Sequence, residues 1–152
     1  MKVELFKAVD NPTIEDVEKV LKEKLGDKYE FKLKKASGIA SQMVGGAAHD
    51  QVTVIKNAYH RTVVSVQIAD DTDVSGKKAT FIYFSEAELA GWLRILHKEV
   101  GFIGAFIIRL IYGSSDDIYD AVKDTIKDNL NIVVEVHKAG LSALFKKNTK
   151  IE

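Results

Sequence analysis

The chain contains no cysteine, which removes one set of chemistries. Without thiols it can form neither disulfides nor cysteine-ligated metal sites, and it has no thiolate nucleophile. Such a composition is typical of proteins in a reducing compartment. Glu4 and Asp10 also interrupt the N-terminal segment, where a signal peptide needs an apolar run. We therefore expect a cytoplasmic protein.

Net charge is also absent, because 22 basic residues balance 22 acidic ones. A balanced chain has no overall electrostatic field that would attract nucleic acid or an anionic membrane. Proline occurs once, and no low-complexity tract separates one part of the chain from another. We expect one domain over residues 1–152, which is an ordinary domain length, with roughly the last seven residues frayed.

Familiar catalytic and cofactor motifs are missing too. The four histidines show no HExxH or HxH spacing, and the glycine-rich segment MVGGAAHD lacks the lysine of a P-loop. No GxSxG or SxxK motif indicates a serine nucleophile. The segment DTDVSG, beginning at Asp71, starts like a calcium loop, but Ile82 stands at the position where a bidentate glutamate is needed. We expect no metal ion and no cofactor.

The sequence does contain one stretch, residues 85–113, that is apolar on nearly every side. In its first half, apolar residues that include Trp92 recur at helical spacing, and Ser85 with Glu88 has the form of a capping box. These features predict a helix that begins near Glu86. The rest of the chain must be arranged to cover this stretch.

The second half of that stretch, residues 102–111, has no polar side chain except Arg109. The uninterrupted apolar run over residues 100–108 is far shorter than the roughly 20 residues that a membrane-spanning helix needs, so we expect no membrane span. Core, pocket wall and subunit interface remain as interpretations. A buried guanidinium needs an acid, carbonyl groups or an anionic ligand, and structural pairing is the commoner outcome.

Period-two alternation of apolar residues predicts four consecutive strands, at residues 29–33, 51–58, 61–69 and 78–85. Short connections between most of them favour an antiparallel meander. Residues near Val3 or after Ile132 provide a further strand, and helical spacing precedes and follows the strand region. The predicted fold class is α+β, with a mostly antiparallel sheet of four or five strands packed on one face by three to four helices.

For function, the sequence favours a non-catalytic binding or interaction module. Residues 102–111 would make a homodimer interface, or they would line a pocket for a small apolar or lipid-like molecule, with Trp92, Phe106 and Arg109 in its wall. The glycine-rich connection over residues 36–50 has the length of many binding loops, which adds His49 to the candidate ligand contacts. An ordinary connecting loop is the alternative.

Two other classes of function remain open. A small enzyme would use an acid/base site that gathers His49, His60 and Asp71 at one edge of the sheet. Single-stranded nucleic acid would need the lysines and aromatic residues of segment 29–35 to share one face. Strand alternation separates them, and the chain has no net charge, so we expect no nucleic-acid partner.

Overall fold

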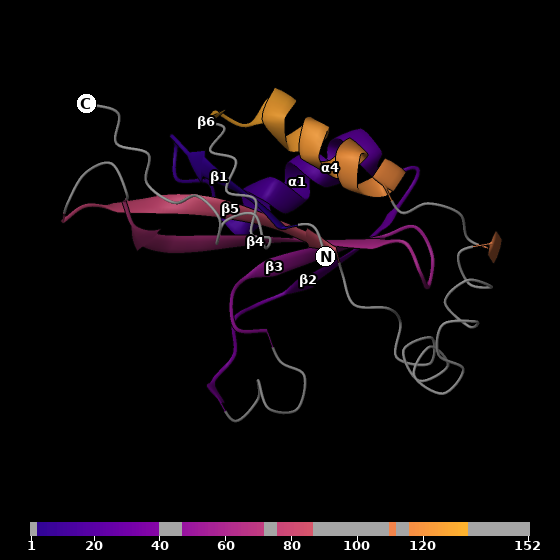
Figure 1. Cartoon of the computed structure of the whole chain (residues 1–152), viewed down its shortest axis with the longest axis horizontal. Coiled ribbons are helices and arrows are strands. Elements are labelled where there is room, and N and C mark those ends of the chain that lie inside the picture. Colours follow the sequence, from indigo (N-terminus) through magenta and orange to yellow (C-terminus); the bar gives the residue numbers. More distant parts are fainter. Residues whose placement is uncertain (1–2, 40–46, 72–75, 87–109, 112–115, 134–152) are drawn as a thin grey trace, which may run out of the picture.

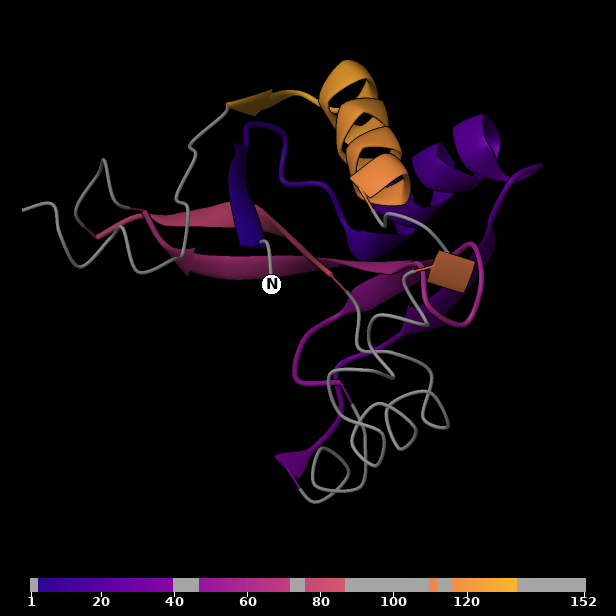
Figure 2. The ribbon, with the colours of Figure 1, turned by 45° about the vertical axis from the view of Figure 1, so that its right-hand side comes forward.

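The computed structural model describes residues 3–39, 47–71, 76–86, 110–111 and 116–133, and it has the predicted α+β class (Figure 1). A six-stranded antiparallel sheet forms one layer. Helices α1 and α4 form a second layer on one face of that sheet, as Figures 1 and 2 show from two directions. The prediction that a helix begins near Glu86 with Ser85 as its cap is wrong, because both residues belong to the strand Lys78–Glu86 and pair with neighbouring strands. The rest of that predicted helix lies in residues 87–109, outside the described residues.

The sheet contains six strands, where the sequence predicted four or five. The four predicted strands do form a meander, and β1 and β6 are added beside β5. The sequence offered one further strand, near Val3 or after Ile132, and the structure contains a strand at both places. Across the sheet the order is β2 (Glu30–Lys34), β3 (Gln51–Ile55), β4 (Arg61–Asp70), β5 (Lys78–Glu86), β1 (Val3–Ala8) and β6 (Ile132–Val133).

The hydrophobic core lies between the sheet and the two helices. Strand alternation directs one set of side chains toward the helices, and Phe6 and Phe84 meet there edge to face with ring centroids 4.9 Å apart. Both rings are fully buried. The core comprises Phe6, Ala8, Ile14, Val17, Leu21, Leu25, Val52, Val54, Val64, Ile82, Phe84, Ile118, Tyr119, Val122 and Ile126.

Helix α1 (Ile14–Leu25) begins at a capping box. The side chain of Thr13 accepts a hydrogen bond from the backbone N–H of Asp16, and the Asp16 carboxylate accepts one from the backbone N–H of Thr13. Pro12 precedes the cap. The position of the cap fixes where α1 starts on the sheet.

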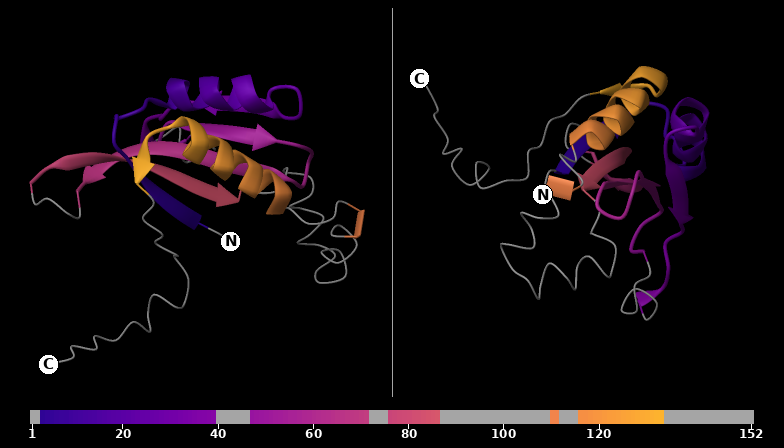
Figure 3. Two further views of the ribbon diagram at one scale, coloured as in Figure 1. Left: turned by 90° about the horizontal axis from the view of Figure 1, so that it is seen from above. Right: turned by 90° about the vertical axis from the view of Figure 1, so that its right-hand side faces the viewer.

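Helix α4 (Asp116–Asn129) lies beside α1, as seen from above in Figure 3, and also contacts β4. Its buried residues Ile118, Val122 and Ile126 recur four apart, which is the spacing that predicted this helix. Together the two helices cover the middle of the sheet face, and the β4–β5 hairpin extends beyond them (Figure 1).

Among the described residues, no helix combines the length and the apolar character needed to cross a bilayer. The run over residues 100–108, on which the expectation of no membrane span depended, lies outside them. The same holds for Trp92, Phe106 and Arg109, so their predicted roles stay predictions.

Thr13→Ala should lower the free energy of unfolding by about 1 kcal/mol, because it removes the acceptor that caps α1. Thr125→Ala is the matched control. The Thr125 hydroxyl donates to the carbonyl of Ala121 inside α4, a bond that adds little to a helix, so this change should stay within about 0.5 kcal/mol of wild type. Urea unfolding measures both. If Thr13→Ala lowers the free energy of unfolding no more than Thr125→Ala does, the cap does not stabilise α1.

Candidate functional site

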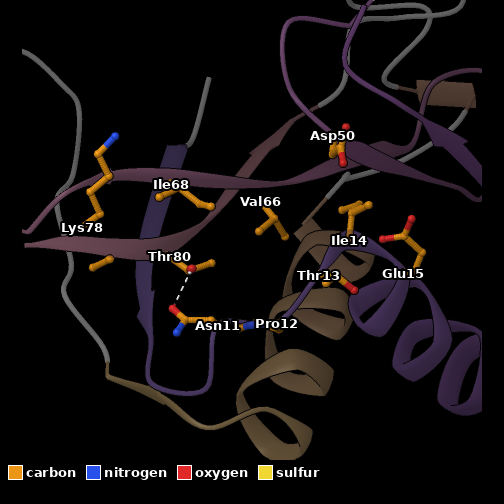
Figure 4. Close-up of a pocket in the computed structure, with 11 residues that line it drawn as sticks. Asn11, Pro12, Thr13, Ile14, Glu15, Asp50, Val66, Ile68, Lys78 and Thr80 are labelled. Carbon is orange, nitrogen blue, oxygen red and sulfur yellow. Dashed lines mark hydrogen bonds between the residues drawn. The ribbon is translucent and has the colours of Figure 1, made fainter.

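A pocket of about 460 Å³ lies between the beginning of α1 and the β4–β5 hairpin (Figure 4). It occupies the helix-covered face of the sheet, beside the first residues of α1. Three separate parts of the chain and the residue before β3 meet there. The lining residues are Asn11, Pro12, Thr13, Ile14, Glu15, Asp50, Val66, Ile68, Lys78, Ala79 and Thr80.

One side of the pocket is apolar. Val66 and Ile68 project from the same face of β4, since they are two residues apart, and Pro12 and Ile14 approach them from the start of α1 (Figure 4). Ile14 is buried in the core, whereas 71% of Ile68 is exposed. An aliphatic side chain therefore stands open to solvent inside a hollow of the surface.

The loop between β1 and α1 is fastened to the pocket by a hydrogen bond. The hydroxyl of Thr80, a residue only 3% exposed, donates to Oδ1 of Asn11 over 2.9 Å (Figure 4). Asn11 has a φ of 47°, the left-handed region that asparagine adopts more readily than most residues. This contact fixes the position of the loop from which α1 starts.

Two carboxylates, Glu15 and Asp50, lie at the other end of the pocket (Figure 4). The Lys35 ammonium bridges them: it donates to Oε1 of Glu15 and lies 3.4 Å from Oδ2 of Asp50. Asp50 also accepts a hydrogen bond from the backbone N–H of Ala36 over 2.8 Å. This end of the pocket thus supplies its own counter-charge.

The same contacts shift the protonation of all three groups. The hydrogen bond from Ala36 holds the pKa of Asp50 below its ordinary value, and Lys35 adds to the effect. The hydrogen bond from Lys35 is the main cause that lowers the pKa of Glu15, and Glu15 in turn raises the pKa of Lys35. Both carboxylates therefore favour the ionised form in the folded chain.

The connection over residues 36–50 is closed at its base, next to the pocket. Ala36 and Ala47 form an isolated bridge, and Ser37 donates to the carbonyl of Ala47 through both its backbone N–H (2.9 Å) and its hydroxyl (3.1 Å). Asp50 completes this base through its bond to Ala36. The role predicted for the loop as a binding loop stays a prediction.

Of the residues proposed from sequence for ligand binding or catalysis, His49 is exposed and adjoins the pocket residue Asp50 without lining the pocket itself. His60 is 2% exposed in the turn between β3 and β4. Its Nδ1 lies 3.1 Å from Nδ2 of Asn57, whose Oδ1 accepts hydrogen bonds from the backbone N–H groups of Tyr59 and His60. These bonds give His60 a structural role in the turn.

Asp71 lies at the opposite end of β4 from His60. The ten residues of the strand place them roughly 30 Å apart, so the two cannot act on one substrate atom. Asp71 forms an ion pair of 2.6 Å with Lys7. The structure thus does not bring His49, His60 and Asp71 together, and no group of His, Asp and Glu within the described ranges is arranged to hold a metal ion.

Sequence reasoning missed the pocket residues, because they come from segments far apart in the chain. Two local signals were present. Thr13 with Asp16 marks a helix start, and Ile68 lies at the end of a strand pattern that has already turned polar. Neither signal says that the two segments face each other.

Acid should destabilise the protein partly through this carboxylate pair. The pKa values of Glu15 and Asp50 are lowered by folding, so their stabilising contribution is complete above the ordinary values of 4.5 and 3.8 and is lost as the pH falls through the folded-state values. Urea unfolding at pH 7 and pH 3 should show that Lys35→Met loses less free energy of unfolding on acidification than the wild type does. The hydrogen bond from Ala36 to Asp50 should preserve part of the pH dependence.

Lys32→Met is the control for that experiment. Lys32 forms a comparable exposed ion pair with Glu30, at 3.3 Å, away from the pocket. Between pH 7 and pH 3, Lys32→Met should lose as much free energy of unfolding as the wild type. If Lys35→Met also loses as much as the wild type, the contacts of Lys35 with Glu15 and Asp50 contribute nothing to the pH dependence.

No protein-family model, no curated protein and no solved structure matches this chain, so its function has to be argued from the site itself.

Proposed function

We propose that the protein is a non-catalytic binding module that takes a small apolar or lipid-like molecule in the pocket at the start of α1. The observation that carries the proposal is the open apolar side of that pocket. Ile68, with 71% of its surface exposed, stands in a hollow of about 460 Å³ next to Val66 and Ile14. That volume is typical of small-molecule sites in proteins.

A single exposed isoleucine on a protein surface needs no explanation. The position of Ile68 in a concave site is different, because one ligand can cover it together with Val66 and Pro12. Each square ångström of apolar surface removed from water contributes about 25 cal/mol. The driving force for binding is therefore already present in the ligand-free protein.

The charged groups of the pocket favour binding over acid/base catalysis. A general base or acid works best when its pKa lies near the working pH. Contacts with Lys35 and Ala36 lower the pKa values of Glu15 and Asp50, which makes both carboxylates weaker bases and leaves them ionised at neutral pH. Such groups suit recognition rather than proton transfer.

Titration with 1-octanol, a neutral apolar probe, tests the pocket. We expect saturable shifts of the methyl NMR signals of Ile14 and Val66, with a dissociation constant of roughly millimolar order for so small a ligand. Ile68→Ser should weaken binding about fivefold, because it removes most of the apolar surface that the ligand covers.

Val133→Ser is the matched control, since Val133 is also aliphatic and 51% exposed but lies in β6, outside the pocket. It should bind octanol like the wild type. If octanol fails to shift the pocket methyl signals, or if both variants weaken binding equally, the pocket is not the binding site.

Self-association as a homodimer is a second candidate, through the surface predicted at residues 102–111. Leu110 and Ile111 are the two described residues of that stretch, and both are 69% exposed. Contiguous apolar patches mark contacts with another protein surface, and in this proposal Leu110 and Ile111 belong to such a patch. Their exposure supports an interface at this surface.

Ile111→Glu should convert the proposed dimer to a monomer, because a charge would be buried in the interface. Ile39→Glu is the control: Ile39 is 79% exposed and belongs to a different segment, so the dimer should persist. Sedimentation equilibrium distinguishes the two states. A monomeric wild type, or a dimeric Ile111→Glu variant, would contradict self-association through this surface.

A further inference from the structure

The pocket has different charge chemistry at its two ends. Lys78 stands at one end and the carboxylates of Glu15 and Asp50 at the other, as Figure 4 shows. Strand register gives the separation. The backbone carbonyl of Asp50 accepts a hydrogen bond from the backbone N–H of Val66, and Lys78 pairs with Asp70 in the β4–β5 ladder. Val66 and Asp70 are four residues apart along β4, so the backbone positions of the two ends of the pocket are about 13 Å apart.

The acidic end is occupied by the protein's own groups. Lys35 bridges the two carboxylates, and the backbone of Ala36 donates to Asp50. One negative charge remains in excess there. An anionic ligand group is repelled from this end, and a cationic one would have to compete with Lys35.

The other end of the pocket holds the ammonium of Lys78. Lys78 shares the pocket face of β5 with Thr80, two residues away, and within the described residues its ammonium forms no hydrogen bond and no ion pair. Asp70 is its neighbour across the ladder, but the two are not paired as an ion pair. The three donor positions of the Lys78 ammonium therefore remain available to a ligand.

Asn11 is held by Thr80 and is not directed at Lys78. Its Oδ1 accepts a hydrogen bond from the Thr80 hydroxyl, and Figure 4 shows the Asn11 amide nitrogen and the Lys78 ammonium pointing away from each other. Lys78 is therefore the group at this end of the pocket that can pair with an anionic head such as a carboxylate.

We infer that the ligand of this pocket is a free, single-chain amphiphile with a carboxylate head. The head is bound by Lys78, and the apolar chain lies over Ile68 and Val66 toward Ile14. Repulsion at Glu15 and Asp50 gives the ligand one orientation. This assignment rests on the proposed binding function, because it concerns the ligand of the same pocket.

Three probes of equal chain length test the head group: octanoate, 1-octanol and octylamine, each titrated at low salt while the methyl signals of Val66 and Ile68 are followed. We expect octanoate to bind about fivefold more tightly than octanol, the limit for an exposed ion pair, and octylamine to bind least tightly. Molar salt should remove these differences, because it screens exposed charges.

Lys78→Met should reduce octanoate binding to the level of octanol and leave octanol binding unchanged. Lys77→Met is the matched control, because Lys77 is the exposed neighbour that precedes β5 and does not line the pocket. It should bind all three probes like the wild type. Asp70→Asn should tighten octanoate binding, since it removes the carboxylate opposite Lys78.

The outcomes separate the two proposals. If the three probes shift the pocket signals with equal affinity, or if octylamine binds most tightly, the carboxylate assignment is overturned while the apolar pocket stands. Equal losses in Lys78→Met and Lys77→Met would also overturn it, because general charge would then explain the preference. If no probe shifts these signals, the binding function itself fails.

Discussion

The packing of two amphipathic helices against one face of the sheet is the constraint on which the rest of this structure depends. Phe6 and Phe84 meet at the centre of that layer, and the buried stripes of α1 and α4 close over them. Burial of this kind supplies most of the stability of a small domain. The helices have to lie where their apolar stripes match the sheet, which decides what remains uncovered.

The pocket is a result of that match. Helix α1 starts at its capping box, and β4 and β5 continue past that point, so Val66 and Ile68 stay open on the same face whose other residues form the core. The bond between Thr80 and Asn11 fixes the approach of the chain to the helix. The binding surface is therefore an extension of the core face, which explains its apolar side.

Much of the fold was predictable from sequence, because it follows from local patterns. The alternation of β2 to β5 and the helical spacing of α1 and α4 are each contained within about a dozen residues. Strands β1 and β6 were harder to predict because their pairing depends on partners distant in sequence. The two-residue strand β6 has no pattern of its own.

The pocket was not predictable for the same reason. The register between β4 and β5 and the position of the start of α1 on the sheet determine which residues line the pocket. Neither can be read from the type of a residue. His60 and Asp71 were selected by chemistry alone, and the length of β4 holds them apart. Trp92, Phe106 and Arg109 lie outside the described residues, so the predictions made for them remain predictions.

The position of β1 in the sheet has a consequence for synthesis of the chain. Val3 pairs with Ser85, so the first strand has no neighbour on the β5 side until more than 80 further residues have been made. At about 5–20 residues per second, this takes roughly 4–16 seconds on the ribosome. Phe6 is exposed during that interval, in a nascent chain that holds a strand without its partner. The N-terminal strand therefore depends on a partner that is made last among the strands from β1 to β5.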